Sequence, residues 1–425
     1  MTNSFTAETY QNEYLPAGGS EINAIVTVTC DGEAPIGGGA TSAVVVIVDV
    51  SGSMNVPRSK IRAARDATAA AIDCIRDGVL FGVVAGSEDG DQVYPSWGGM
   101  IAASEQTRGD AKNAVGKLKA GGGTAIGEWL KTANEMFRSA QADICHAILL
   151  TDGEDEGESP AALDRALDEC KGRFQCDCRG IGTDWRVSEL RTIASALLGT
   201  VDIVAAPEAL ANDFAAMTQA AMAKSVGDVR LRVWAPQGAE VAFVKQVSPA
   251  IDDLTPKGVA VNDLACDYPT GAWGRESRDY HISVRVRPRE IDEEALAARV
   301  SLVVDDEIVS QSLIKAIWTG DHALSTRINR EVAHYTGQAE LANVIQEGLA
   351  ARKRGNDDEA TTKLGRAVQI AAESGNDGTM KLLSTVVDVD DAATGTIRLK
   401  RSVTDADEMT LDTRSTKTTR IEIAD

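Results

Sequence analysis

The most regular hydrophobic pattern of the chain is a run of six apolar residues, mostly β-branched, at 43–48. Such a run predicts a central strand of a parallel sheet that is buried on both faces. Oxygen-bearing side chains follow at every second position, at Asp49, Ser51 and Ser53. They fall at the carboxyl end of the strand, where open α/β sheets place their ligand sites. A helix pattern starts near Ser59.

Strand and helix patterns alternate through residues 41–224. Short apolar runs predict strands, and apolar positions three and four residues apart predict helices between them. We expect strands at 80–85, 144–150, 176–181 and 200–204, and helices at 59–75, 107–118, 124–140, 160–170, 187–196 and 207–223. Residues 91–101 are interpreted as a β-hairpin. The alternation predicts a doubly wound, mostly parallel sheet, a Rossmann-like α/β fold with helices on both faces.

A different pattern, in which apolar and polar residues alternate, lies on both sides of this segment. It appears first at 22–30, within a region 1–40 that ends in a glycine-rich linker, and returns in 225–320. The strands expected there are 229–234, 240–246, 279–287, 299–304 and 308–317. Alternation with turn signals between the strands predicts an antiparallel β-sandwich. We therefore expect an α/β domain at 41–224 inserted between the first and second strands of a sandwich.

Residues 321–387 change to helical spacing. Helix patterns at 327–354 and 360–373 resemble one tetratricopeptide-type hairpin, and a single hairpin cannot form a solenoid. Two roles stay open for it: a cap packed on the sandwich, or an arm that docks a partner. The tail, 388–425, is poor in apolar residues, and we expect it to be flexible or loosely docked.

The charge of the chain narrows the class of partner. Its 425 residues carry a formal net charge of −21, which disfavours a nucleic-acid backbone or an anionic membrane. No apolar run approaches the roughly 18 residues that a membrane-spanning helix needs. The first residues lack the basic and apolar regions of a signal peptide. We expect a cytoplasmic protein that binds neither nucleic acid nor membrane.

The seven cysteines favour a reducing compartment, because their number is odd and a complete disulfide framework needs pairs. Cys170, Cys176 and Cys178 lie close enough in sequence to suggest zinc. They lack the paired CxxC spacing and a nearby histidine, so reduced cysteines are the simpler interpretation.

Two later segments supply further oxygen donors. A glycine-rich loop presents Thr124, and a second buried strand ends in Asp152. Together with Asp49, Ser51 and Ser53, these residues resemble the metal-ion-dependent adhesion site of the von Willebrand factor type A domain, in its bacterial intracellular type. That site uses Asp-x-Ser-x-Ser, a distant Thr and a distant Asp. All of these positions are filled here, in order.

The resemblance implies a bound divalent cation, Mg²⁺, with Mn²⁺ and Ca²⁺ as alternatives. Ser51, Ser53 and Thr124 would be direct ligands, and Asp49 and Asp152 direct or water-bridged ligands. Neutral hydroxyl ligands leave the charge of a hard cation largely uncompensated. The resemblance therefore implies an open coordination position that attracts an outside carboxylate. The partner would be a protein that presents an Asp or Glu, and this chain a scaffold or assembly factor.

Little in the sequence points to catalysis. The four histidines form no HExxH motif, and the chain contains neither a GxxxxGK[ST] nor a GxSxG motif. We therefore expect no enzymatic activity. The alternative function is a metal-dependent hydrolase, or the metal-handling subunit of a chelatase- or ATPase-type complex, in which similar domains work beside a separate ATPase.

An acidic segment, 154–158, directly follows the strand that ends in Asp152. One interpretation is a solvated loop whose acids favour the start of the next helix. The other is a second cation site, or a screen against strongly acidic partners. The residues alone leave both open.

Overall fold

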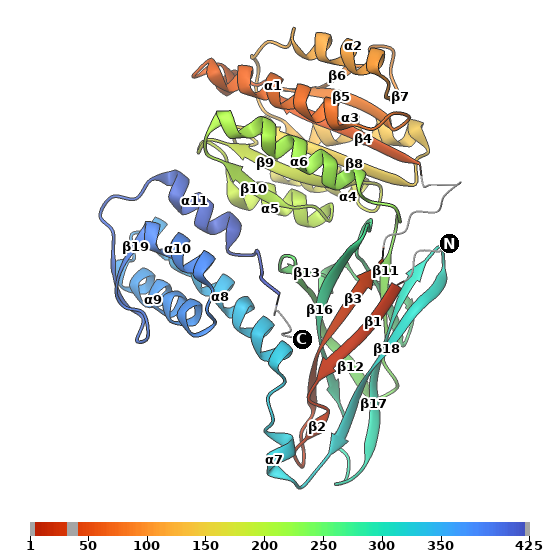
Figure 1. The fold of residues 1–425 in the computed structure, drawn as a ribbon, viewed down its shortest axis with the longest axis vertical. Helices are drawn as coiled ribbons and strands as arrows, with labels where there is room; N and C mark the ends of the chain where they lie inside the picture. The colour runs from red at the N-terminus through yellow and green to blue at the C-terminus, as the bar shows by residue number, and fades with distance from the viewer. Residues whose placement is uncertain (1–4, 32–40, 421–425) are drawn as a thin grey trace. The chain divides into compact units, whose positions relative to one another are not determined.

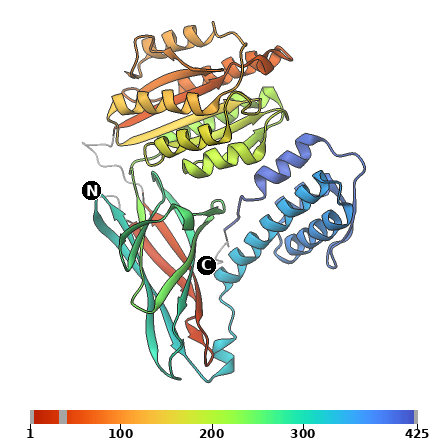
Figure 2. The same cartoon turned by 180° about the vertical axis from the view of Figure 1, so that it is seen from behind.

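The structure, a computed structural model, describes residues 5–31 and 41–420. The chain divides into two compact units: one consists mainly of 34–228, and the other of the segments before and after it (Figures 1 and 2). The predicted glycine-rich linker falls almost entirely within 32–40, outside the described residues. Within the described ranges, no helix is both long enough and apolar enough to cross a bilayer.

A seven-stranded sheet with the order β10-β9-β8-β4-β5-β6 forms the centre of the first unit, and β7 also pairs with β5. β4 (Ser42–Asp49) runs parallel to β5 (Leu80–Gly86) and to β8 (Ile144–Thr151). Both faces of β4 are buried, as its apolar run predicts. The other strands are β6 (Gly90–Tyr94), β7 (Ile101–Ala102), β9 (Gln175–Ile181) and β10 (Val201–Val204). The predicted hairpin at 91–101 is wrong, because β6 and β7 each pair with β5 and not with one another.

Helices cover both faces of this sheet. The helical elements are η1 (Gly52–Asn55), α1 (Ser59–Cys74), α2 (Glu105–Val115), α3 (Ile126–Ala140), α4 (Pro160–Cys170), α5 (Val187–Ala196), η2 (Pro207–Ala209) and α6 (Leu210–Met222). α1, α2 and α6 share one core with β4, β5 and β8. α3, α4 and α5 pack on the opposite face. The predicted doubly wound order is confirmed, and α3 begins two residues after Thr124, which leaves this residue in a loop.

The second unit contains a β-sandwich whose sheets have the orders β1-β3-β16-β12-β13 and β14-β15-β11-β17-β18-β2. Its strands are β1 (Phe5–Gln11), β2 (Tyr14–Leu15), β3 (Glu21–Cys30), β11 (Arg230–Trp234), β12 (Ala239–Ser248), β13 (Asp252–Asp253), β14 (Val259–Asn262), β15 (Ala265–Pro269), β16 (Glu276–Val286), β17 (Glu294–Val304) and β18 (Glu307–Trp318), with η3 (Thr255–Lys257) between β13 and β14. All pairs are antiparallel except β18 with β2. The α/β unit is inserted between β3 and β11. The sequence reasoning missed β1, an edge strand in which only Phe5 is buried.

A helical region follows the sandwich, as predicted. It contains α7 (His322–Ser325), α8 (Arg330–Lys353), α9 (Asp357–Glu373) and α10 (Asp377–Val386). α8 and α9 form the expected hairpin, with α10 as an additional helix. Tyr335 of α8 packs against Ile25 and Val247 of the sandwich. The start of α8 therefore lies on the sandwich, which agrees with the cap interpretation.

The expectation of a flexible or loosely docked tail from residue 388 is wrong over the described residues. β19 (Val387–Asp391) pairs with β20 (Thr396–Leu399), and α11 (Asp405–Arg414) follows. Leu411 of α11 is fully buried in the core of the helical region. The tail has few apolar residues, but α11 buries Met409 and Leu411, and its Glu408 forms an ion pair with Arg352 of α8 at 2.7 Å.

Candidate metal centre

The carboxyl edge of the parallel sheet brings two aspartates together. β4 ends at Asp49, and its neighbour β8 is followed directly by Asp152. Asp49 Oδ2 accepts hydrogen bonds from the Thr151 hydroxyl at 2.6 Å and from the Asp152 backbone N–H at 3.3 Å. Both carboxylates are fully buried. Residues about one hundred positions apart thus meet because two parallel strands end at the same edge.

The two serines lie on the turn that follows β4. The backbone N–H of Ser51 donates to Asp49 Oδ1 at 2.7 Å, which turns the chain back over the end of the strand. The hydroxyls of Ser51 and Ser53 share a hydrogen bond of 2.9 Å, and Ser53 Oγ donates to Asp152 Oδ1 at 2.6 Å. Ser51 is buried and Ser53 is exposed, so this row of oxygens opens to solvent at Ser53.

The glycine-rich loop brings Thr124 to the same place. The Gly52 N–H donates to the Gly122 carbonyl at 2.9 Å, which ties the loop to the serine turn. Gly122 has a φ of +86°, in the left-handed region that favours glycine. A Cβ built on Gly153 would lie 3.3 Å from Ser53 Oγ and 3.6 Å from Thr124 Oγ1. Both hydroxyls therefore face one point beside Gly153.

All five residues predicted from the sequence are gathered at this edge, and their donor set fits Mg²⁺. An octahedral Mg²⁺ ion has its ligands at about 2.0–2.1 Å, so adjacent ligand oxygens are about 3 Å apart. The Ser51–Ser53 and Ser53–Asp152 oxygen separations of 2.9 Å and 2.6 Å are close to this value. An all-oxygen set suits a hard cation better than zinc, which favours nitrogen and sulfur. Their role as metal ligands stays a prediction.

The electrostatics of Asp49 also favour a cation. Burial raises the pKa of Asp49 from 3.8 to about 6, although hydrogen bonds from Ser51 and Thr151 lower it. The charge of Asp152 adds to the rise. A buried carboxylate that receives only neutral donors is poorly stabilised in its ionised form, and a nearby positive charge would favour that form.

Sequence reasoning missed two residues of the site, Thr151 and Lys60. Lys60 Nζ lies 2.7 Å from Asp152 Oδ2 and 2.9 Å from Asp184 Oδ2. Burial works to lower the pKa of Lys60, but the two carboxylates outweigh it and hold this pKa above its ordinary value. A signal was present: Lys60 occupies the first position of the buried stripe of α1, which continues through Ala64.

The acidic segment 154–158 is engaged in local contacts. The Asp155 N–H donates to Glu189 Oε2 at 3.0 Å, and Glu158 accepts from the backbone N–H of Gly127 in the first turn of α3. Burial, followed by the neighbouring Glu158, raises the pKa of Asp155 to about 8. In the described part of the chain, no group of three or more His, Cys, Asp or Glu residues, the clustered cysteines included, is arranged to hold a metal. These contacts favour the helix-start interpretation.

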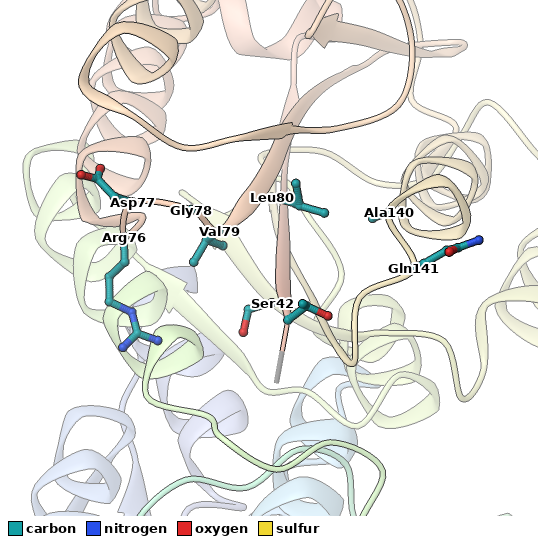
Figure 3. Close-up of a pocket in the computed structure, with 9 residues that line it drawn as sticks. Ser42, Arg76, Asp77, Gly78, Val79, Leu80, Ala140 and Gln141 are labelled. Atoms are coloured by element: carbon teal, nitrogen blue, oxygen red, sulfur yellow. The ribbon is translucent and has the colours of Figure 1, made fainter. Parts of the chain in front are cut away.

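A separate pocket of about 580 Å³ lies in the α/β unit (Figure 3). Its lining includes Ser42 and Leu80, the first residues of β4 and β5, together with Arg76 and Gln141. It is therefore at the amino end of the parallel strands. The five candidate ligands lie at the carboxyl end, so the pocket is not part of the candidate metal centre.

Two family models match segments of this chain, one in the α/β unit and one near the C-terminus. Residues 42–203 match the family model of the von Willebrand factor type A domain, and residues 369–415 match that of the von Willebrand factor type A C-terminal domain. A solved structure of a von Willebrand factor type A protein from Catenulispora acidiphila is 51% identical, with a TM-score of 0.94, and the match covers 99% of this chain and 98% of that one.

Two further comparisons concern proteins of lower sequence identity. The ArnB paralog VWA2 from Sulfolobus acidocaldarius is 17% identical, with 98% of each chain covered and a TM-score of 0.63, which shows a likeness in fold alone. A protein from Synechocystis sp. is 27% identical over 217 residues. That match covers 49% of this chain and 49% of the relative, so the chain spans about half the length of this curated protein.

Proposed function

The chain belongs to the von Willebrand factor type A family, and from this premise we propose that it is a divalent-metal-dependent protein-binding module, a scaffold or assembly factor. Domains of this family mediate metal-dependent protein interactions in general. For this chain, the proposal is that the metal centre binds an Asp or Glu side chain of a partner protein. The cation is Mg²⁺, with Mn²⁺ and Ca²⁺ as alternatives.

Each of the five residues has a part in this proposal. Ser51, Ser53 and Thr124 hold the cation through hydroxyl oxygens, and Asp49 and Asp152 hold it directly or through water. The bound cation supplies a positive centre that accepts a further carboxylate oxygen. Asp49 is fixed by three donors of the fold, so the chain positions this carboxylate before any partner arrives.

The observation that carries the proposal is the mixed burial of the donor set. The aspartates, Ser51 and Thr124 are buried, while Ser53 is exposed and contacts Asp152. A cation held there would be bound from the protein side and would remain reachable from solvent. This arrangement supports a docking site for an outside group and differs from a closed structural metal site, in which protein ligands fill every position.

We propose binding without catalysis, and two of the four histidines, the commonest general bases, are engaged away from the centre. His146 pairs with Asp177 at 2.8 Å, and His281 contacts Asn23 at 2.9 Å in the sandwich. At the centre itself, the carboxylates of Asp49 and Asp152 are occupied by hydrogen bonds and an ion pair. We also propose that the protein acts in the cytoplasm, and that nucleic acid and membranes are not its partners, given its net charge of −21.

Affinity capture with three matched baits tests the protein-binding function. The baits are the wild type, Thr124→Val and Thr218→Val, each in Mg²⁺ and in chelator. Thr218 is also a buried threonine, but its hydroxyl bonds the Phe214 carbonyl within α6. We expect a partner that the wild type and Thr218→Val retain in Mg²⁺ and that Thr124→Val or chelator releases. Replacing the partner's acidic residues by amides should then abolish capture. Retention that is equal in chelator and with Thr124→Val would contradict the proposal.

A further inference from the structure

Lys60 is a buried cation placed against one carboxylate of the candidate metal centre. It lies in the first turn of α1, the helix that follows the serine turn, and is 7% exposed. Its ammonium group lies 2.7 Å from Asp152 Oδ2 and 2.9 Å from Asp184 Oδ2. The Asp184 side chain is 67% exposed, whereas that of Asp152 is fully buried. The contact with Asp152 is therefore the one shielded from water.

The placement is unusual for a lysine. Lysine is almost never fully buried unless it is paired, because its charged group loses hydration. The position of Lys60 is set close to the serine turn along the chain. Its backbone N–H donates to the Pro57 carbonyl at 3.0 Å, and α1 starts there. The sequence therefore places a positive charge seven residues after Ser53, in the first turn of the helix that follows the metal-binding motif.

The oxygens of the two aspartates are divided between distinct partners. Asp49 receives neutral donors, namely the Ser51 N–H and the Thr151 hydroxyl. Asp152 receives the Ser53 hydroxyl on Oδ1 and the Lys60 ammonium on Oδ2. Within the described residues, Lys60 is a cationic side chain that contacts the donor set, and it pairs with the aspartate that also bonds the exposed serine.

We propose that Lys60 is a built-in counter-cation that shares Asp152 with the metal, stabilising the centre when metal is absent and weakening its affinity for metal. This inference rests on the proposed function and deepens it. A cation that binds beside an already neutralised carboxylate has less of its own charge compensated. It therefore attracts a partner's carboxylate more strongly, at the expense of resident metal affinity.

The test measures metal affinity and thermal stability of the full chain for the wild type, Lys60→Met and Lys60→Arg. Methionine keeps most of the apolar stem and removes the charge, whereas arginine keeps the charge. For Lys60→Met we expect Mg²⁺ to bind more tightly by about tenfold, by calorimetry, because a like charge near the ion is removed. Its melting temperature in chelator should fall, and its rise on adding Mg²⁺ should exceed that of the wild type. Lys60→Arg should stay near the wild type in both measurements.

Opposite movement of stability and affinity separates this role from a merely structural one. If Lys60 only positioned Asp152, its loss would lower stability and metal affinity together. Unchanged or weaker Mg²⁺ binding by Lys60→Met, with clear binding by the wild type, overturns the inference and leaves the proposed function standing. An absence of Mg²⁺ binding by the wild type overturns the proposed function itself.

A variant that fails to fold in chelator also gives a decisive result. If Lys60→Met, or Lys60→Gln as a second neutral variant, folds only in saturating Mg²⁺, the metal has replaced the missing charge and the inference is supported. Failure of both neutral variants to fold even in saturating Mg²⁺ contradicts it. Asp184→Asn serves as an outer control, because it removes only the exposed partner of Lys60 and leaves the contact with Asp152.

Discussion

Each of the two units holds a buried aspartate on a central strand, Asp279 and Asp49, and the surroundings shift the pKa values of the two carboxylates in opposite directions. Asp279 on β16 is 2% exposed and accepts two hydrogen bonds from the Arg420 guanidinium, at 2.8 Å and 2.6 Å. The Tyr335 hydroxyl and the Thr27 hydroxyl complete its shell. Burial works to raise the pKa of Asp279, but Arg420, Tyr335 and Thr27 outweigh it and hold this pKa below its ordinary value.

Asp49 on β4 is equally buried, but among the described residues its hydrogen-bond donors are neutral: the Ser51 and Asp152 N–H groups and the Thr151 hydroxyl. Burial raises its pKa to about 6. The neutral donors do not offset this rise, because they stabilise the charge less than a guanidinium would. The comparison shows what distinguishes a structural ion pair, that of Asp279 with Arg420, from a candidate binding site. Asp279 is satisfied by the chain itself and fastens the C-terminal segment to the sandwich. The negative charge of Asp49 is only partly stabilised by the chain, and a bound cation would stabilise it further.

The largest effect on stability is expected when the ion pair between Asp279 and Arg420 is removed. Asp279→Asn removes the charge that accepts hydrogen bonds from Arg420, Tyr335 and Thr27. We expect a loss of about 3 kcal/mol in the free energy of unfolding of the second unit, less than for a fully buried pair because the Arg420 side chain is 41% exposed. Urea denaturation, followed by signals from each unit, measures it. The control is Asp306→Asn, which removes an exposed ion pair with Arg230 and should leave the transition unchanged. If the two variants lowered the stability equally, the contrast between the ion pair of the buried Asp279 and the ion pair of the exposed Asp306 would be contradicted.

The pH dependence of the two aspartates should have opposite signs. The folded-state pKa of Asp49, about 6, is above the ordinary 3.8, so the folded state binds more protons between these values. In chelator, this group therefore makes the first unit less stable as pH rises from about 4 to about 6, by at most about 3 kcal/mol. Asp49→Asn should remove this loss. Asp279, with its lowered pKa, instead contributes stability at neutral pH that is lost as pH falls through its folded-state pKa.

Denaturation of the wild type and Asp49→Asn across this pH range, in chelator, checks the sign. The stability of the variant relative to the wild type should increase with pH. A difference that stays constant, or one that shrinks as pH rises, would mean that Asp49 is stabilised as well as Asp279 is.

A smaller effect is expected from a single neutral donor. Thr151→Val removes the hydroxyl that lies 2.6 Å from Asp49 Oδ2, and should cost about 1–3 kcal/mol, because a buried acceptor loses a partner. Thr218→Val should cost less, since the hydroxyl of Thr218 bonds only a carbonyl of its own helix. Thermal or urea denaturation of both variants in chelator sharpens the comparison. An equal cost would show that the hydrogen bond to Asp49 has no special weight.

The gathering of the five candidate ligands at one sheet edge was predictable from the sequence because their positions are tied to local patterns. A buried strand followed by alternating oxygens places Asp49, Ser51 and Ser53, and parallel strands end at one edge, which brings Asp152 beside them. The α/β insertion into a sandwich was predictable for a similar reason. The period of the hydrophobic pattern changes at both ends of the insertion.

The rest of the fold depends on long-range pairing that no local pattern reports. Arg420 meets Asp279 across 141 positions, and nothing near either residue indicates the other. The expectation of a flexible tail was wrong because low apolar content hid the few residues, such as Leu411, that α11 buries. Lys60 was overlooked because a lysine at the start of a helix ordinarily points to solvent, whereas this one is directed at Asp152.

Calorimetric titration of Mg²⁺ and Mn²⁺ into the wild type, Asp49→Ala, Thr124→Val and Thr218→Val tests the central claim, that five oxygen donors form one cation site. The wild type and Thr218→Val should show saturable binding with the same affinity. Thr124→Val should bind much more weakly, and Asp49→Ala should show no binding while remaining folded by circular dichroism. Affinity for Mg²⁺ that is the same in Asp49→Ala and in the wild type would contradict the account.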